Sequence, residues 1–299
     1  MTVLTAGGMA SGLANAEALR SQEASENRRV LALASPGLLL IGLVLFLPMG
    51  WLFFLSFTGE GGFTLEHYAR MSHPAYRKTF TTTFEISFIV TAVCVALGYP
   101  LAYLMSQVAE RARPWLLACV LLPFWTSLLV RTYAWLVLLQ RRGVINDWLI
   151  DLGLIDEPLR IVHNMTGTVI GMSHIMLPFL VLPLYASMKA IDRDLIKAAA
   201  NCGATPVQAF RQIFLPLSLP GLFAGVVLVF VLCLGFYVTP AVLGGGRVVM
   251  WAMQIESNVA LYANWGAASA LGVALLVVTL AILWGVTRLF GIDRHLGRS

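Results

Sequence analysis

Long windows with almost no charge are the feature that most limits what this chain can fold into. Several stretches contain almost no Asp, Glu, Lys or Arg, although the chain as a whole is 12% charged. About 20 residues of helix, rising 1.5 Å each, cross the hydrocarbon layer of a bilayer. The windows are continuous rather than alternating in polarity, which disfavours membrane-spanning strands. The sequence therefore predicts an all-α integral membrane protein.

The apolar windows predict six transmembrane helices. Their approximate ranges are 30–57, 79–107, 114–139, 164–188, 222–242 and 265–290. Residues 1–29 are rich in Ala, Ser, Gly, Glu and Arg, and we expect a disordered tail there. The expected division is this tail, then 30–78 as the first span with an outer loop, 79–290 as the main transmembrane domain, and 291–299 as a second tail.

The distribution of basic residues predicts the orientation of the spans. The two tails, the loop 107–113 and the segment between spans four and five hold 12 of the 20 Lys and Arg residues, and the other loops hold 7. Loops rich in Lys and Arg remain in the cytoplasm. We therefore expect both termini, and the segment between spans four and five, on the cytoplasmic side.

Several classes of function lack the residues they need. The four cysteines form no CxxC pair, so no metal or disulfide framework is predicted. No GxxxxGK[ST], GxSxG or HExxH motif occurs. The net charge of +5 indicates orientation in a membrane chain rather than a nucleic-acid partner. We expect no catalytic residue, no metal site and no enzyme activity in this chain.

A charged, Pro-containing segment, residues 192–221, interrupts the apolar sequence between spans four and five. Asp192 or Asp194 suits the N-cap of a short helix, because its carboxylate accepts from free backbone N–H groups. Gly203 suits the left-handed position that ends this helix. The sequence thus predicts a short first helix that is capped at Asp192 or Asp194, contains the helix-favouring residues Leu195–Asn201 and ends at Gly203.

A second helix is predicted directly after the first. Thr205 suits its N-cap, and Gln208 stands where a capping box requires a side chain that reaches back. We expect this helix to run to about Phe214, to be stopped by Pro216, and to be followed by a turn at Pro220. The result is a helix–turn–helix at the membrane surface, which on shape alone is also compatible with an interfacial hairpin that merely joins two spans.

The spacing of this segment resembles the EAA motif of permease subunits of binding-protein-dependent ABC importers. The resemblance implies the type I ABC importer permease fold, with a cytoplasmic coupling helix–turn–helix at 192–214 that docks on an ATPase. It assigns ATPase coupling to Asp194, Lys197, Ala198, Ala199, Gly203, Ala204, Phe210, Ile213, Leu215 and Pro216. Lys197 departs from the pattern, which has Glu there. This implies a differently charged groove on the partner, or a contact made without this residue.

Further stretches resemble the spermidine/putrescine permease subfamily. They include LGYPLAYLM at 97–105, VRTYAWLVLLQRRGVIND at 130–147 and GFYVTPAVLGGG at 235–246. The likeness implies import of a small solute, a polyamine first, by alternating access across a bacterial inner membrane. Opines, aminoalkylphosphonates, thiamine and ferric iron are the alternatives. Implied partners are a periplasmic binding protein, a second homologous permease, and two ATPase subunits that bind ATP and Mg²⁺, with no cofactor in this chain.

Two ionisable residues inside predicted spans mark a candidate pathway. Glu85 and Arg131 have opposite charge and lie at matching depth, about two turns from the outer boundary. One interpretation is an ion pair that fixes helix packing. The other is a gate or a substrate contact, in which a free Glu85 carboxylate would suit an ammonium group.

Five more residues are candidates for the pathway, each with a structural alternative. His174 lies at mid-depth in span four and is either a packing histidine or a pathway contact. Tyr133 and Trp135 form either an interfacial aromatic belt or a surface that attracts cations. Tyr237 and Thr239 lie near the outer end of span five.

Two rival classes remain open from the sequence. A stand-alone secondary transporter usually shows paired repeats and broken helices, and no repeat is visible here. An intramembrane enzyme would need a nucleophile and base or a metal set, and none is visible.

Overall fold

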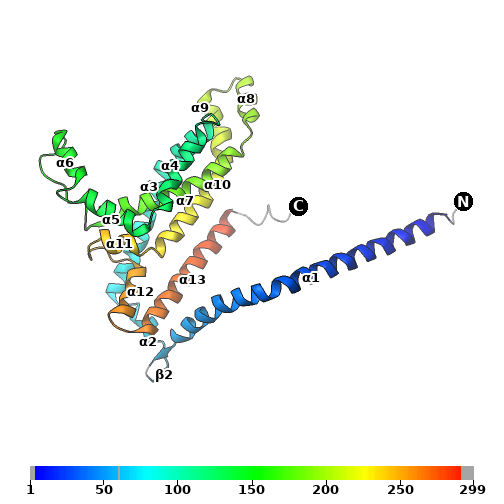
Figure 1. Ribbon diagram of the computed structural model, residues 1–299, viewed down its shortest axis with the longest axis horizontal. Helices are drawn as coiled ribbons and strands as arrows, with labels where there is room; N and C mark the ends of the chain where they lie inside the picture. The colour runs from blue at the N-terminus through cyan, green and yellow to red at the C-terminus, as the bar shows by residue number, and fades with distance from the viewer. Residues whose placement is uncertain (1–3, 60, 291–299) are drawn as a thin grey trace. The chain divides into compact units, whose positions relative to one another are not determined.

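The computed structural model describes residues 4–59 and 61–290, and residue contacts divide the chain after Leu55 (Figure 1). The first unit is one helix, α1 (Leu4–Leu55), whose Ala32–Leu55 part is apolar enough to cross a membrane. The disordered tail predicted for residues 1–29 is therefore wrong from Leu4 onward. Its Ala, Leu, Glu and Arg residues are strong helix formers, and they continue the helix of the first span. The second predicted tail, 291–299, lies outside the described residues.

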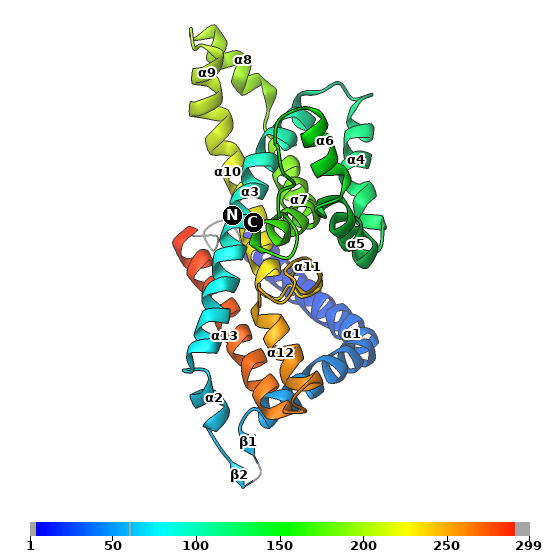
Figure 2. The same ribbon diagram turned by 90° about the vertical axis from the view of Figure 1, so that its left-hand side faces the viewer.

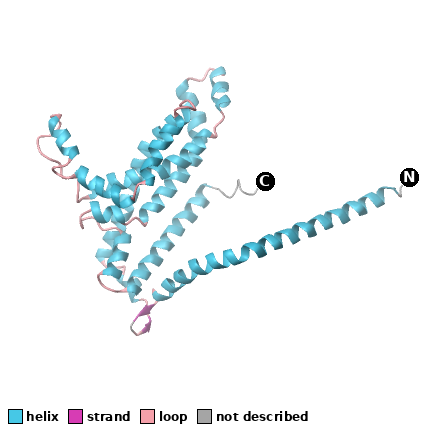
Figure 3. Ribbon diagram, in the orientation of Figure 1, coloured by secondary structure: helices cyan, strands magenta, loops and turns pink. Residues whose placement is uncertain are grey.

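The second unit is helical apart from one short hairpin, β1 (Thr58–Gly59) paired with β2 (Gly62–Phe63) (Figure 3). Its long apolar helices are α3 (Pro74–Gln107), α7 (Met165–Lys189), α10 (Leu215–Leu234) and α13 (Trp265–Phe290). Of the shorter helices, α2 (Glu66–Arg70) precedes α3, and α6 (Val144–Asp151) and α12 (Trp251–Ala260) lie between the long helices in the chain. Together with α1 and one bent pair, the described residues reach the six predicted spans.

The third span is broken. α4 (Arg113–Trp125) meets the stretch Leu128–Asp151, which begins with α5 (Leu128–Leu139), at a bend of 97°, so the single helix predicted over 114–139 is wrong. Pro123 cannot donate a backbone hydrogen bond in the last turn of α4. The Thr126 hydroxyl donates to the Pro123 carbonyl at 2.7 Å. This bond satisfies a carbonyl at the helix end in place of a further turn.

The helix that starts the fifth span does not stop where we predicted. α9 (Pro206–Ala209), the π-helical turn η1 (Phe210–Phe214) and α10 form one continuous stretch. The Leu215 N–H bonds the Phe210 carbonyl five residues back, and this wider turn makes room for Pro216, which has no N–H. The predicted span 222–242 instead breaks after Leu234, and α11 (Val238–Leu243) follows as a separate helix.

The core of the second unit lies where α7 packs between α3 and α10, which run beside it in both views (Figure 2). A Cβ at Gly98 of α3 would lie 2.6 Å from the Leu180 side chain, and one at Gly225 of α10 would lie 3.0 Å from the Leu180 carbonyl. Glycine at both positions thus allows a close approach on either side of α7. The fully buried side chains at this core include Cys94, Met172, Leu180, Leu184, Val229 and Cys233.

Hydrogen bonds from Trp251 attach α12 to two of the long helices. Its backbone N–H donates to the Thr83 hydroxyl of α3 at 2.8 Å, and its indole N–H donates to the Leu271 carbonyl of α13 at 3.0 Å. Buried donors satisfied in this way are costly to disrupt. The end of the second unit that carries α12 is therefore fixed to α3.

Replacing Gly225 by valine tests the close approach of α7 and α10. The added Cβ meets the carbonyl oxygen and Cα of Leu180, backbone atoms that cannot rotate away, and overpacking of this kind costs about 1–3 kcal/mol. Gly225→Val should lower the melting temperature of the detergent-solubilised protein, followed by tryptophan fluorescence. Gly272→Val is the matched control, because a Cβ at Gly272 meets nothing within 4 Å. Equal melting temperatures for both variants would contradict the packing argument.

Candidate functional sites

The segment of residues 192–214, hereafter the 192–214 element, lies at one end of the second unit, and α12 and the hairpin lie toward the other (Figures 1 and 2). The Asp192 carboxylate caps α8 (Arg193–Asn201) by accepting from the Asp194 N–H at 2.9 Å. Gly203 ends α8 at φ +85°, where the Gly203 and Ala204 N–H groups bond carbonyls of the last turn. The predicted cap and the predicted end of the first helix are confirmed, with Asp192 rather than Asp194 as the N-cap.

The second predicted cap is also present. The Thr205 hydroxyl accepts from the Gln208 N–H at 3.3 Å, and the Gln208 side chain accepts from the Thr205 N–H at 2.8 Å. This reciprocal capping box satisfies two N–H groups that the start of a helix leaves free. The bend between α8 and α9 is thus fixed by local hydrogen bonds, and it presents α8 away from the long helices.

Lys197 and Asp194 form an exposed ion pair on α8, with Nζ and Oδ1 2.8 Å apart. The hydrogen bond from Lys197 lowers the pKa of the Asp194 carboxyl, and the same bond raises the pKa of the Lys197 ammonium. Both groups are therefore charged at neutral pH. The positive charge of Lys197 is therefore paired with a carboxylate of the same chain.

The ten residues that the resemblance assigned to coupling divide by exposure. Asp194, Lys197, Ala198, Gly203 and Pro216 are exposed, and Ala199, Ala204, Phe210, Ile213 and Leu215 are half-buried. Apolar side chains accompany the exposed set, with Leu195 46% and Val207 65% exposed. The element thus offers a partly apolar outer surface of small side chains, which suits close approach by another protein.

The inner side of the element packs on α3 through four aromatic rings. Phe210 and Phe214 meet Tyr103 edge-on, with ring centroids 5.4 and 5.1 Å apart. The Tyr99 hydroxyl bonds the Ser218 hydroxyl of α10 at 3.0 Å. Sequence reasoning missed Phe214, Tyr99 and Tyr103, although two pairs of aromatics spaced four apart indicate a shared helix face.

A second group of predicted residues meets between α5 and α7. The Trp135 indole N–H donates to His174 Nδ1 at 3.1 Å, so the neutral imidazole carries its proton on Nε2. Arg131, one turn earlier on α5, has its Nε and Nη1 atoms buried, and no hydrogen bond to them is found within the described residues. The structure therefore brings Arg131, Trp135 and His174 to one place.

Glu85 does not belong to this group. No ion pair joins Glu85 to Arg131 in the part of the chain that the structure describes, and Glu85 is exposed on α3. The predicted pairing is wrong because α5 bends away from α4 toward α7 and α11. The prediction assumed that span three is one straight helix, which would place Arg131 at the same depth as Glu85. The 97° bend moves Arg131 away from that position.

α11 completes the same region. The Thr132 and Thr239 hydroxyls lie 3.2 Å apart and join α5 to α11, and both side chains are buried. Tyr133 and Tyr237 are exposed near them. Figures 1 and 2 place α5 and α11 between the two ends of the second unit. Short helices that interrupt a span leave polar backbone at mid-membrane, which is where transporters bind their solutes.

The two interrupted spans, the central α7 and the surface helix–turn–helix together define an α-helical membrane permease. A solved structure of a bacterial ABC transporter that imports the acidic polysaccharide alginate has a chain with this fold: the TM-score is 0.69, at 18% identity, over 90% of this chain and 96% of that chain. A chain of the MetNI methionine ABC transporter gives a TM-score of 0.52, at 18% identity, over 71% and 93%. The fold is that of type I ABC importer permeases.

The chain belongs to the family of binding-protein-dependent transport system inner membrane components, whose profile matches residues 95–290. It is a permease subunit of an ABC importer and a multi-pass inner membrane protein. It is 35% identical to the spermidine/putrescine transport system permease protein PotB of Haemophilus influenzae, over 74% of this chain and 77% of that protein. PotB of Escherichia coli is 34% identical over 76% and 84%. The molybdenum transport system permease ModB of Mycobacterium bovis is 28% identical over 73% and 81%.

Replacing Trp135 by phenylalanine tests whether the α5–α7 group serves transport. The variant keeps an aromatic ring and loses the hydrogen bond to His174, whose net worth of about 1 kcal/mol corresponds to about a fivefold change. We expect solute uptake by the reconstituted importer to fall by about that factor. Trp148→Phe is the control, because Trp148 is 66% exposed on α6. Equal uptake by the two variants would show that the group only supports packing.

Proposed function

We propose that this chain forms half of a polyamine pathway in an ATP-driven importer. The observation that carries the proposal is the likeness to spermidine/putrescine permeases, at 34–35% identity over about three quarters of the chain. The exposed aromatic rings of Tyr133 and Tyr237 support it, since aromatic faces attract ammonium groups.

The Arg131 guanidinium would repel a polyamine, because both are positively charged. A guanidinium at this depth requires an anion, a carbonyl or water, and none of its described neighbours bonds its buried Nε and Nη1 atoms. We infer that a second, homologous permease supplies the acceptors. The polyamine then passes the aromatic rings on the open side of α5 and α11, and Arg131 fixes the contact between the two permeases.

The partners follow from the family. An ABC importer permease works with ATPase subunits and a solute-binding protein. We propose two ATPase subunits, which bind ATP and Mg²⁺, and a periplasmic binding protein that delivers the solute. Both termini and the 192–214 element then face the cytoplasm, as the distribution of Lys and Arg indicates. This chain would hold no cofactor and carry out no covalent chemistry.

The mechanism that we propose is alternating access. Closure of the ATPase dimer displaces the 192–214 element and opens the spans toward the periplasm, and hydrolysis resets them. The ATPase can bias the two states only by the difference in its affinity for them. A surface helix–turn–helix with fixed caps provides a rigid contact through which that difference can act.

Uptake by the purified importer tests the function. The chain should be co-purified with the second permease and ATPase encoded beside it, reconstituted in liposomes with ATP inside, and supplied outside with the binding protein and radiolabelled spermidine or putrescine. We expect ATP-dependent uptake of a polyamine. Competition by an opine, an aminoalkylphosphonate, thiamine or ferric iron instead would identify another solute. Uptake by this chain alone, without the ATPase, would contradict the importer mechanism.

Reversing the charge of Lys197 tests the docking role of α8. Lys197→Glu breaks the pair with Asp194 and places a third acid beside Asp192, on a surface whose partner groove we expect to accommodate a cation. Uptake and the stimulation of ATP hydrolysis by loaded binding protein should both fall several-fold.

The double variant Asp194→Lys, Lys197→Glu is the matched control. It restores an ion pair three residues apart but keeps the acid at position 197. Recovery in the double variant would assign the loss to the broken pair, and no recovery would assign it to the acid at position 197 itself. The docking role fails if Lys197→Glu alone leaves both uptake and stimulated hydrolysis at wild-type levels.

A further inference from the structure

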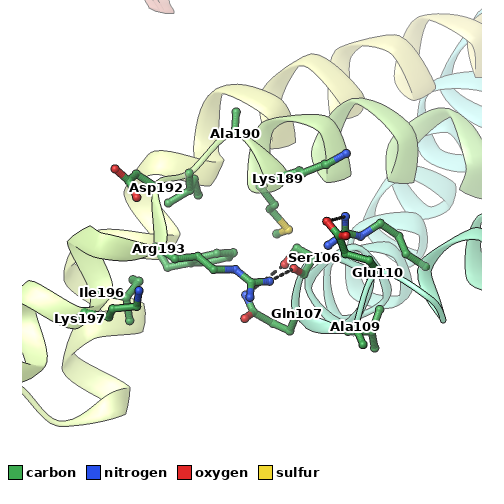
Figure 4. Close-up of a pocket in the computed structure, with 15 residues that line it drawn as sticks. Ser106, Gln107, Ala109, Glu110, Lys189, Ala190, Asp192, Arg193, Ile196 and Lys197 are labelled. Atoms are coloured by element: carbon green, nitrogen blue, oxygen red, sulfur yellow. Dashed lines mark hydrogen bonds and ion pairs between the residues drawn. The ribbon is translucent and has the colours of Figure 1, made fainter.

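The first residue of α8 is bonded to the end of a helix far away in the sequence. Arg193 Nη2 donates to the Ser106 carbonyl of α3 at 2.8 Å, across 87 positions of the chain. Figure 4 shows the guanidinium extended from α8 toward this carbonyl. Sequence reasoning did not single out either residue, because no local pattern relates the start of α8 to the end of α3.

The Ser106 carbonyl is a strong acceptor for a cation. It belongs to the last turn of α3, where carbonyls lack an intrahelical N–H partner and the helix dipole favours positive charge. The Ser106 hydroxyl donates to the Tyr103 carbonyl at 2.7 Å and accepts from the Gln107 side chain at 3.2 Å. Ser106 is 6% exposed, so the acceptor is held in place.

The bond crosses an open space. A cavity of about 790 Å³ lies between α8, the end of α7 and the turn that follows α3, and Arg193, Ser106, Lys189 and Lys197 are among its lining residues (Figure 4). α8 has no buried residue. Among the residues that the structure describes, the Arg193 bond is the one hydrogen bond or ion pair that joins α8 to α3.

Three long helices can respond to a force on the 192–214 element, and they are attached differently. α7 precedes α8 by three residues, and α10 continues from α9 through η1, so both are covalently connected to the element. α3 is not. It is held by the aromatic contacts of Phe210 and Phe214 and, at the first helix of the element, by Arg193.

We propose that Arg193 is a positioning residue for coupling: its bond to Ser106 makes α3 follow α8 when the ATPase displaces the element. α3 extends to the other end of the unit, where Thr83 bonds Trp251 of α12. A displacement of the Ser106 end therefore reaches α12 along one helix, which also packs on α7. This proposal rests on the proposed ATP-driven function.

Lys197 keeps Arg193 available for this bond. Residues 193 and 197 are four apart and therefore neighbours on the surface of α8. A glutamate at 197 would attract the guanidinium away from the Ser106 carbonyl. Lys197 instead repels Arg193 and pairs with Asp194. The lysine at position 197, where the motif has glutamate, and the bond from Arg193 to α3 are thus parts of one arrangement of charges.

The test measures the movement of α3 in the complete importer. Spin labels at Leu104→Cys of α3 and Leu280→Cys of α13, both positions being exposed, report the distance between the two helices with and without ATP and vanadate. Exposed Cys119 and Cys202 are first replaced by serine. We expect a distance change in the otherwise unaltered importer and a change reduced by at least about half in Arg193→Gln, because a charged hydrogen bond carries roughly a tenfold preference.

Two variants separate the bond from charge and from folding. Arg193→Lys retains a donor and should keep part of the movement, and Lys189→Gln removes a cation from the same cavity without removing the bond. Basal ATP hydrolysis and assembly should be unchanged in Arg193→Gln, while spermidine uptake per ATP hydrolysed falls about fivefold to tenfold. A general structural defect would lower hydrolysis and uptake together.

The outcomes distinguish this proposal from the proposed function. An undiminished movement of α3 in Arg193→Gln overturns the role of Arg193, as does the absence of any movement in the importer with Arg193 intact. A movement that depends on Arg193, without uptake of spermidine or putrescine, supports the coupling role and contradicts the polyamine substrate. If Lys197→Glu reduces the movement of α3 no further when it is combined with Arg193→Gln, the two residues act through the same arrangement of charges.

Discussion

The packing of α7 between α3 and α10 holds both candidate sites in position. Glycines at 98 and 225 let the two outer helices approach Leu180 closely, so the three helices are packed directly against one another at this level. The α5–α7 group is built on the middle of these three helices, and the 192–214 element is attached to their end. A force on one site is therefore felt at the other through packed helices.

The membrane sets the second constraint, because backbone groups exposed where a helix breaks must find partners inside the protein. Here hydroxyl groups meet that need: Thr126 bonds the end of α4, and Thr132 and Thr239 join the broken parts of spans three and five. The breaks are thus stabilised features. They bring polar and aromatic groups to mid-depth, where an unbroken helix would expose only apolar side chains to a solute.

The apolar windows and the caps of the 192–214 element could be predicted from sequence, because both depend on neighbouring residues. Asp192, Gly203 and Thr205 act within three or four positions of themselves. The bend after α4 and the continuation through Pro216 depend on how a helix end is satisfied, which residue type alone does not determine. The error at Glu85 followed from the bend, and the Arg193–Ser106 bond joins the start of α8 to the end of α3, which only the fold brings together.

The effect of the residue at position 197 depends on the charges beside it on α8. Position 197 lies one turn after Arg193, so its sign decides whether the guanidinium stays on α8 or reaches α3. With lysine there, Asp194 takes the ammonium and Arg193 is free to bond the Ser106 carbonyl. With glutamate, the same arginine would be retained on α8, and α3 would follow the element through its aromatic contacts and its packing on α7 and α10. Relatives with glutamate at this position should therefore attach α3 by different contacts.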